Sequence, residues 1–201
     1  MSQWTLAGCV LVFLCAALFY LRRSVKQRQQ LRRLQEELAR LREEAGQGDV
    51  DPMTGLLNRY AMARWMEQEQ GFDGLVAVCD LDDFKVLNDQ YGHLVGDEIL
   101  HGVGKLVQAS IREQDRAFRW GGDEMVIFFR NLDTELAQAR LRGLEERLQR
   151  FQIRNHGPVA IRFSWGLAPA SGRGLQESLE AADHLMYESK RTKKPSTIGN
   201  G

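Results

Sequence analysis

The chain has 201 residues, of which 43% are hydrophobic and 27% charged. That length suits one domain with a sizeable core and an extension, and excludes several large domains. Lys and Arg balance Asp and Glu at 27 each, with the positive surplus in residues 1–46. The mildly acidic remainder lacks the basic surface of a nucleic-acid-binding protein, and three irregularly spaced cysteines exclude a disulfide framework or zinc site.

The first stretch of the chain is apolar. Residues 4–20 contain no charged side chain, and four basic residues follow between positions 22 and 28. About 17–25 apolar residues span a bilayer as a helix, and positive charge stays on the cytoplasmic side. The pattern predicts a single-pass transmembrane anchor over residues 1–22, with the rest of the chain in the cytoplasm. A cleaved signal peptide and a buried core helix are the alternatives.

Residues 23–48 are charged and rich in helix-forming residues. Leucines at positions 31, 34, 38 and 41 keep the spacing of a coiled-coil seam over about three heptads. The seam predicts a short coiled coil that pairs two copies of the chain into a homodimer, and a solvated single helix is the alternative. Gly46 and Gly48 then break the helix and form a hinge before the domain predicted over residues 49–201.

Helix and strand patterns alternate through this domain. The apolar run Leu75 to Cys79 predicts a buried strand ending at Asp80, apolar residues around Gly121-Gly122 predict a hairpin, and Val159 to Ala168 predicts another strand. Helical patterns cover Thr54 to Gln70, Phe84 to Gln90, Asp97 to Ile111, Asp133 to Phe151 and Leu175 to Arg191. This order predicts an α+β fold whose antiparallel-rich sheet has helices on one side.

Two predicted strand ends carry acidic residues. Asp80 closes the first strand, and Asp123 and Glu124 follow the glycine pair. Glycine lacks a Cβ and takes positive φ readily, so the backbone at Gly121 and Gly122 can pass close to a phosphate. Converging carboxylates bind a hard divalent cation, and Mg²⁺ completes its octahedron with phosphate oxygens and water. The pattern therefore indicates a nucleotide site, with an exposed hairpin turn as the alternative.

The chain resembles the GGDEF domain family of diguanylate cyclases from residue 51 to about residue 194. The matching motifs, in the family's order, are Asp51 to Arg59, Asp80 to Lys85, Asn88-Asp89, Tyr91-Gly92-His93, Gly96-Asp97, Arg119 to Glu124, Ser164-Trp165-Gly166 and Ala182-Asp183 to Lys190. The resemblance implies a palm-like fold, as in nucleotidyl cyclases and polymerases. It also implies a bacterial enzyme that joins two GTP molecules into cyclic di-GMP and releases two pyrophosphates, here anchored in the inner (cytoplasmic) membrane.

The resemblance further implies where the chemistry lies. Asp80, the main-chain carbonyl of Leu81 and Asp123 match the family's ligands for Mg²⁺, which Mn²⁺ can replace. Asp123 or Glu124 is expected to take the proton of the 3′-hydroxyl that attacks the α-phosphorus. Each domain holds one GTP, so catalysis needs two domains face to face.

Other positions match the family's substrate contacts. They are Lys85, Lys190 and Lys194 for the triphosphate, Gly121 and Gly122 for the backbone beside it, and Asn88 and Asp97 for the guanine base. The residues alone leave other interpretations open. These are a surface lysine at Lys85, a cation near a helix C-terminus at Lys190, a helix C-cap at Asn88, and caps of the next helix at Asp82 and Asp83.

An Arg-x-x-Asp stretch precedes the hairpin. Arg112 and Asp115 lie at the spacing at which the family forms an inhibitory site for cyclic di-GMP, so the resemblance implies product inhibition. Arginine can bind a phosphate or a guanine edge through two hydrogen bonds, and aspartate can accept from the base. The alternative is an exposed Arg–Asp pair that closes a helix and contributes at most about 1 kcal/mol.

The sequence departs from the family at two places. Met125 stands where the family has phenylalanine, and methionine fills apolar space adaptably. Lys194 and Pro195 replace the usual arginine and asparagine, which predicts weaker triphosphate binding because lysine lacks the bidentate fork. Two alternatives to a cyclase are a catalytically weak domain that binds GTP or cyclic di-GMP as a regulator, and a scaffold for a membrane complex. The intact acids favour the enzyme.

Overall fold

The computed structural model describes residues 48–193 except residues 155 and 171–173. The chain divides into two compact units, residues 1–48 and 49–201, and the second contains nearly all of the described residues. The predicted anchor and, apart from residue 48, the predicted coiled coil lie outside the described residues. Lys194 also lies outside them.

The prediction of a location in the inner membrane is corrected by the structure. Among the helices of the described part of the chain, none is long and apolar enough to cross a bilayer. Helix α6 (Leu175–Lys193), for example, has 19 residues but is interrupted throughout by charged side chains.

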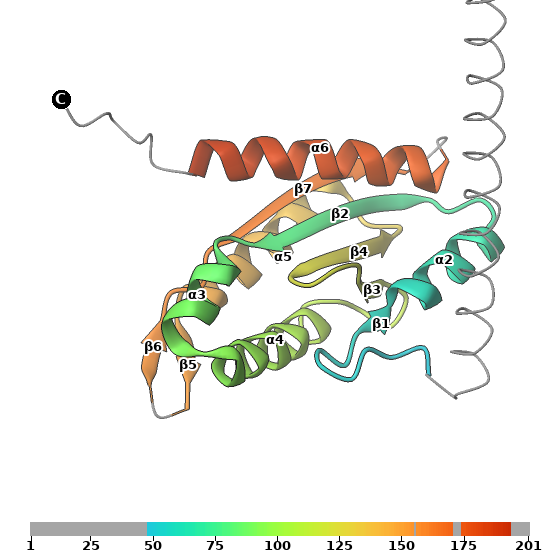
Figure 1. Ribbon diagram of the computed structural model, residues 1–201. Helices are drawn as coiled ribbons and strands as arrows, with labels where there is room; N and C mark the ends of the chain where they lie inside the picture. Colours follow the sequence, from blue (N-terminus) through green and yellow to red (C-terminus); the bar gives the residue numbers. More distant parts are fainter. Residues whose placement is uncertain (1–47, 155, 171–173, 194–201) are drawn as a thin grey trace, which may run out of the picture. The chain divides into compact units, whose positions relative to one another are not determined.

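A five-stranded sheet forms the centre of the domain (Figure 1). Its strands, in spatial order, are β1 (Leu57–Asn58), β3 (Arg116–Arg119), β4 (Glu124–Arg130), β2 (Gly74–Leu81) and β7 (Phe163–Pro169). Only the short pair β1 and β3 is parallel, and the other neighbours are antiparallel. The predicted α+β class with an antiparallel-rich sheet is confirmed.

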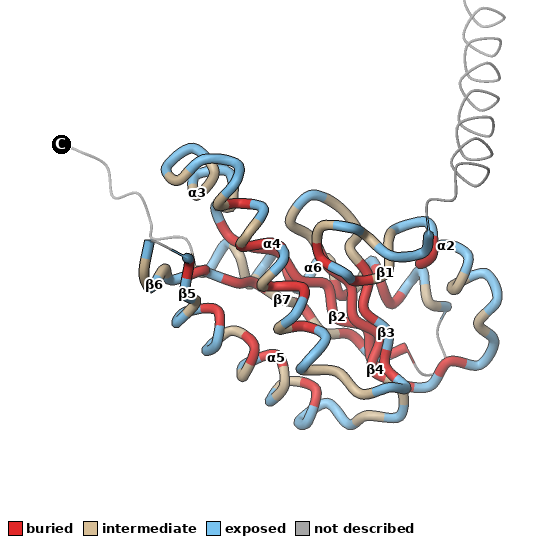
Figure 2. Tube along the Cα trace, turned by 90° about the horizontal axis from the view of Figure 1, so that it is seen from below, coloured by how far each residue is buried: buried red, intermediate tan, exposed pale blue. Residues whose placement is uncertain are grey.

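Helices cover both faces of this sheet. The odd-numbered residues 75–81 of β2 pack with α4 (His93–Gln108) and α5 (Thr134–Leu148), and Val76 and Val78 pack with α2 (Arg59–Gln68) and α6. Figure 2 shows buried residues, in red, throughout the central strands and recurring along the helices. The expectation of helices on one side is wrong, because the continuous apolar run of β2 is typical of a strand buried on both faces.

Several element boundaries differ from the predicted ones. Helix α2 begins at Arg59, later than predicted, because the Asn58 side chain accepts hydrogen bonds from the backbone amides of residues 60 and 61 and caps the helix. The strand predicted over 159–168 is interrupted. Its first residue, Val159, ends β6 (Gly157–Val159), which forms a small hairpin with β5 (Phe151–Ile153), and residues 163–168 belong to β7.

Helix α6 lies directly on β7. A Cβ atom at Gly166 of β7 would lie 2.1 Å from the Ala182 carbonyl oxygen and 2.2 Å from the Met186 amide nitrogen. The backbones of strand and helix therefore touch with no side chain between them. This contact fixes the height of α6 above the sheet.

We expect Gly166→Ala to lower the free energy of unfolding by about 1–3 kcal/mol or more, because the new methyl group meets fixed backbone atoms. The matched control is Gly143→Ala in α5, where a Cβ would meet nothing within 4 Å. It should stabilise the chain by about 0.5–1 kcal/mol. Urea denaturation of the full chain measures both. Equal stability of wild type and Gly166→Ala would contradict the close contact.

Candidate functional site

The ends of β2 and β4 bring the predicted acids together. Asp80 lies opposite Glu124 in the antiparallel register of the two strands. The Leu81 amide donates to the Asp123 carbonyl oxygen across 3.4 Å. Four residues, 120–123, connect β3 to β4, so the predicted hairpin forms with its glycine pair in the connection. Residues about forty positions apart in sequence are thus neighbours at one end of the sheet.

Arg119 organises this connection. Its Nε donates to the carbonyl oxygens of Gly121 and Gly122 at 3.1 Å each, and Nη2 donates to the Gly122 oxygen at 2.7 Å. Its Nη1 donates to both carboxylate oxygens of Asp51 at 3.0 and 3.1 Å. Burial acts to raise the pKa of Asp51, but hydrogen bonds from Thr54 and the charge of Arg119 outweigh it and lower the pKa. Asp51, in the first of the matching motifs, is therefore linked to the glycine turn through Arg119.

The two glycines serve the turn through their missing side chains. Neither Gly121 nor Gly122 has positive φ, so that anticipated use of glycine does not occur here. A Cβ at Gly121 would lie 2.7 Å from Oε2 of Glu124, whereas a Cβ at Gly122 would meet nothing within 4 Å. Gly121 thus leaves space for the Glu124 carboxylate, and Gly122 leaves its side of the turn open.

The acids form an electrostatically unfavourable group. Burial raises the pKa of Asp80, and the charges of Asp123 and Asp82 add to that rise and outweigh the pairing of Asp80 with Lys190. Burial also raises the pKa of Glu124, as do the charges of Asp80 and Asp123. Such repulsion is what a bound cation would relieve.

The donor chemistry of this group fits a hard divalent cation. Asp80 and Asp123 supply carboxylate oxygens, and Leu81, which follows Asp80 at the end of β2, supplies a main-chain carbonyl oxygen. Within the residues the structure describes, however, no three His, Cys, Asp or Glu side chains are arranged as a ready ligand group. The Lys190 ammonium contacts Asp80 instead.

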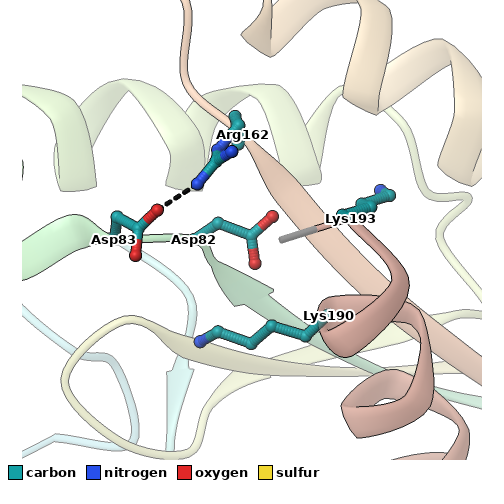
Figure 3. A pocket seen from close by; sticks show the side chains of 5 residues that line it. All are labelled: Asp82, Asp83, Arg162, Lys190 and Lys193. Atoms are coloured by element: carbon teal, nitrogen blue, oxygen red, sulfur yellow. Dashed lines mark hydrogen bonds and ion pairs between the residues drawn. The ribbon is translucent and has the colours of Figure 1, made fainter. Parts of the chain in front are cut away.

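A polar pocket lies beside Asp80. Five charged residues line it, namely Asp82, Asp83, Arg162, Lys190 and Lys193 (Figure 3). Asp82 accepts a hydrogen bond from Ser164 Oγ at 3.0 Å, and Asp83 pairs with Arg162. Asp83 is the N-cap residue of α3 (Phe84–Tyr91), as the alternative interpretation had it, but its side chain makes no capping hydrogen bond there.

Sequence reasoning missed most of this pocket. Lys193 donates to Glu145 Oε1 of α5 and to the Phe163 carbonyl oxygen of β7, each at 2.6 Å. Trp165 Nε1 donates to the other carboxylate oxygen of Glu145 at 3.4 Å. These contacts join residues up to 48 positions apart, and no local pattern signals them.

The predicted base-binding residues lie on α3 and α4. Asn88 packs against Gly96, where a Cβ would lie 1.8 Å from Asn88 Oδ1, so a larger residue at position 96 would require the Asn88 side chain to move. The C-cap of α3 is Gly92 and not Asn88. Asp97 and Lys85 are exposed, and neither side chain has a partner among the described residues. Both are therefore available to a ligand.

The Arg-x-x-Asp stretch is more tightly built than an exposed pair. Asp115 is buried and accepts hydrogen bonds from the backbone amides of Arg112 and Arg130 at 2.9 and 3.1 Å. The Arg112 guanidinium binds the same carboxylate and the Arg130 carbonyl oxygen. The hydrogen bond with Asp115 raises the pKa of Arg112. The stretch thus fastens the end of β4, and the alternative of an exposed pair is wrong.

Comparison with known proteins identifies the class of this domain. A family profile described as "Diguanylate cyclase, GGDEF domain" matches residues 48–196. The coiled coil and GGDEF domain of DgcB from Caulobacter crescentus, solved in complex with c-di-GMP, superposes with a TM-score of 0.67 at 26% identity, covering 86% of this chain and 94% of that one. The fold is therefore of the nucleotidyl cyclase type.

Curated relatives agree. The chain is 34% identical over 150 residues to diguanylate cyclase DgcP of Pseudomonas aeruginosa. The aligned residues make up 71% of this chain and 22% of DgcP. The chain is 30% identical over 155 residues to probable diguanylate cyclase DgcC of Escherichia coli K12, covering 73% and 42% respectively. The chain thus spans less than half the length of either relative. It belongs to the GGDEF family, and the resemblance seen in the sequence is confirmed.

We expect Glu124→Gln to raise the melting temperature of the full chain at pH 7. The folded-state pKa of Glu124 is raised, so keeping the carboxylate ionised destabilises the folded chain. This penalty is absent below the unfolded pKa of about 4.3 and develops as pH rises through the folded-state pKa. The gain from Gln should therefore shrink toward pH 4.

The control is Glu67→Gln, which removes an exposed carboxylate from α2. It should change the free energy of unfolding by less than about 0.5 kcal/mol at either pH. Thermal melts at several pH values measure both variants. A Glu124→Gln variant that is less stable than wild type at pH 7 would show that the carboxylate is not under electrostatic strain.

Proposed function

We propose that this chain is a diguanylate cyclase that condenses two GTP molecules into cyclic di-GMP and releases two pyrophosphates. The observation that supports it most is the group of carboxylates where β2 meets the glycine hairpin, with Asp80 opposite Glu124 and Asp123 beside them. The relatives that carry the name diguanylate cyclase support the same activity.

Asp80, Asp123 and the Leu81 carbonyl would hold the metal, which we propose to be Mg²⁺ with Mn²⁺ as a substitute. When bound, the metal would neutralise charge on the triphosphate and stabilise the leaving pyrophosphate. Asp123 or Glu124 takes the proton of the attacking 3′-hydroxyl. Because burial and neighbouring carboxylates raise the pKa of Glu124, its carboxylate is a stronger base than an exposed glutamate.

Several residues outside this group of acids are proposed as substrate contacts. Lys85, Lys190 and Lys194 would bind the triphosphate, which would pass the open side of the turn at Gly122. Asn88 and Asp97 would bind the guanine, because its N1–H and its amino group can donate hydrogen bonds to their side-chain oxygens. Gly121 would line the same turn, and its missing side chain leaves space for the Glu124 carboxylate.

We also propose that two domains act together. Each 3′-hydroxyl must attack the α-phosphorus held by the other domain, so a homodimer is needed. The coiled coil predicted over residues 23–48 would supply the pairing by raising the local concentration of the second domain. In support, the similar DgcB structure contains a coiled coil next to its GGDEF domain.

Asp123→Ala and Asp80→Ala should each reduce GTP turnover of the full chain to background. Removing one carboxylate ligand dismantles the proposed metal site. Mass spectrometry of the products from GTP and Mg²⁺ measures the reaction and identifies cyclic di-GMP. Glu67→Gln is the matched control and should retain the wild-type rate.

Three outcomes separate the candidate functions. Cyclic di-GMP that disappears in the two variants supports the cyclase. Binding of GTP or cyclic di-GMP without product would favour the regulatory domain named above, and neither binding nor product would favour a scaffold. Full activity in a folded Asp123→Ala variant would overturn the assignment of the site.

Product inhibition is the second proposal for this family member, through Arg112 and Asp115. Cyclic di-GMP would exchange with the partners that the Arg112 guanidinium now has, Asp115 and the Arg130 carbonyl. Arg112→Ala should leave the initial rate nearly unchanged and remove the slowing that follows as product accumulates. Progress curves with added cyclic di-GMP measure this.

The control for this experiment is Arg116→Ala, which removes a neighbouring guanidinium that donates to the backbone carbonyl oxygens of Glu113 and Asp115. It should remain inhibited like wild type. Inhibition of Arg112→Ala at the wild-type level would show that this stretch only fastens the end of β4.

A further inference from the structure

Lys190 occupies a position that the proposed metal also needs. Its ammonium contacts Oδ1 of Asp80, a carboxylate that is almost completely buried. A lysine side chain is ordinarily charged at neutral pH, and the neighbouring Asp80 carboxylate favours the charged form. An ammonium and a divalent cation cannot share one buried carboxylate oxygen without strong repulsion. Metal binding at Oδ1 of Asp80 would therefore displace Lys190.

Asp82 provides an acceptor for the displaced ammonium. Asp82 is 6% exposed, and its Oδ2 accepts a hydrogen bond from Ser164 Oγ. Its Oδ1 is buried and has no hydrogen-bond partner among the described residues. A buried carboxylate oxygen without a donor is costly, so it is expected to have one in at least one state of the protein. Asp82 and Lys190 line the same pocket, and in Figure 3 the Asp82 carboxylate lies between Arg162 and Lys190.

The backbone of α6, which carries Lys190, is held in place and cannot easily shift when a metal binds. One turn later, Lys193 is fixed to Glu145 and to the Phe163 carbonyl oxygen. Gly166 contacts the α6 backbone directly. The movement is therefore confined to the Lys190 side chain, whose ammonium group is carried by a flexible four-carbon stem. The other two cations of the pocket, Arg162 and Lys193, already have partners.

We propose that Lys190 is a resident counter-ion of Asp80 in the metal-free domain, and that Asp82 is a positioning residue that accepts the Lys190 ammonium when a divalent cation binds Asp80. The proposal rests on the proposed function, in that Asp80 is a metal ligand. The exchange keeps the buried charges balanced in both states. It also links metal binding to the orientation of a lysine that is expected to contact the triphosphate.

The exchange predicts opposite effects on metal affinity. Lys190→Met removes the competitor, so the full chain should bind Mn²⁺ alone roughly fivefold more tightly or better. Asp82→Asn keeps an acceptor for Ser164 but removes the charged acceptor for Lys190, so Mn²⁺ should bind roughly fivefold more weakly. Electron paramagnetic resonance of free Mn²⁺, without nucleotide, measures both affinities.

The double variant is the decisive comparison. If Asp82 acts through Lys190, Asp82→Asn should weaken Mn²⁺ binding by at most about twofold in the Lys190→Met background. An equal effect in both backgrounds would show that Asp82 acts on the metal by its own charge, and would overturn the exchange. Arg191→Met is the matched control, because it removes one positive charge from the exposed side of the same helix. It should leave the affinity nearly unchanged.

A separate variant distinguishes this proposal from the metal site itself. Mn²⁺ binding that is unchanged in Asp80→Asn would mean that Asp80 is not a metal ligand, and both proposals would fail. Binding that is lost in Asp80→Asn but is the same in Lys190→Met and wild type would overturn only the exchange. Thermal melts of each variant show whether the chain is folded.

Discussion

The hydrogen bonds of Arg119 are the interaction on which the site depends. One guanidinium holds the carbonyl oxygens of the glycine turn and, on its other edge, the Asp51 carboxylate of the opening loop. A planar group with five fixed donors can impose geometry on two segments at once, which a lysine cannot. Because Asp123 and Glu124 follow this turn directly, Arg119 and the pairing of β2 with β4 together set their positions relative to Asp80.

The same geometry places the acids close enough to repel one another. β2 is covered on both faces, so its last acidic residue ends in a partly dry environment beside other carboxylates. The apolar packing of the sheet and helices offsets this cost, at about 1.5–3 kcal/mol for each large buried side chain. The packing that stabilises the core therefore also brings the repelling carboxylates together at the strand ends. Such repulsion is common at sites that bind a cation.

Sequence patterns were sufficient for the elements that local chemistry determines. The apolar run before Asp80, the glycine pair and the helical periodicities each depend on near neighbours, and they predicted the strand, the hairpin and most helices. They could not show that β2 is covered on both faces or that 151–159 forms a small hairpin. Nor could they reveal contacts such as Ser164 with Asp82 or Lys193 with Glu145, because partners 82 and 48 residues apart leave no trace in a single sequence.

The direct backbone contact at Gly166 has a mechanical consequence. Helices that pack through side chains can slide by small steps as rotamers change. The backbones of β7 and α6 are in direct contact at Gly166, so no side chains there can adjust to such a movement. β7 and α6 should therefore respond to force as one stiff body. A displacement of α6 would therefore carry β7 with it, while the Lys190 side chain on α6 stays free to rotate on its own.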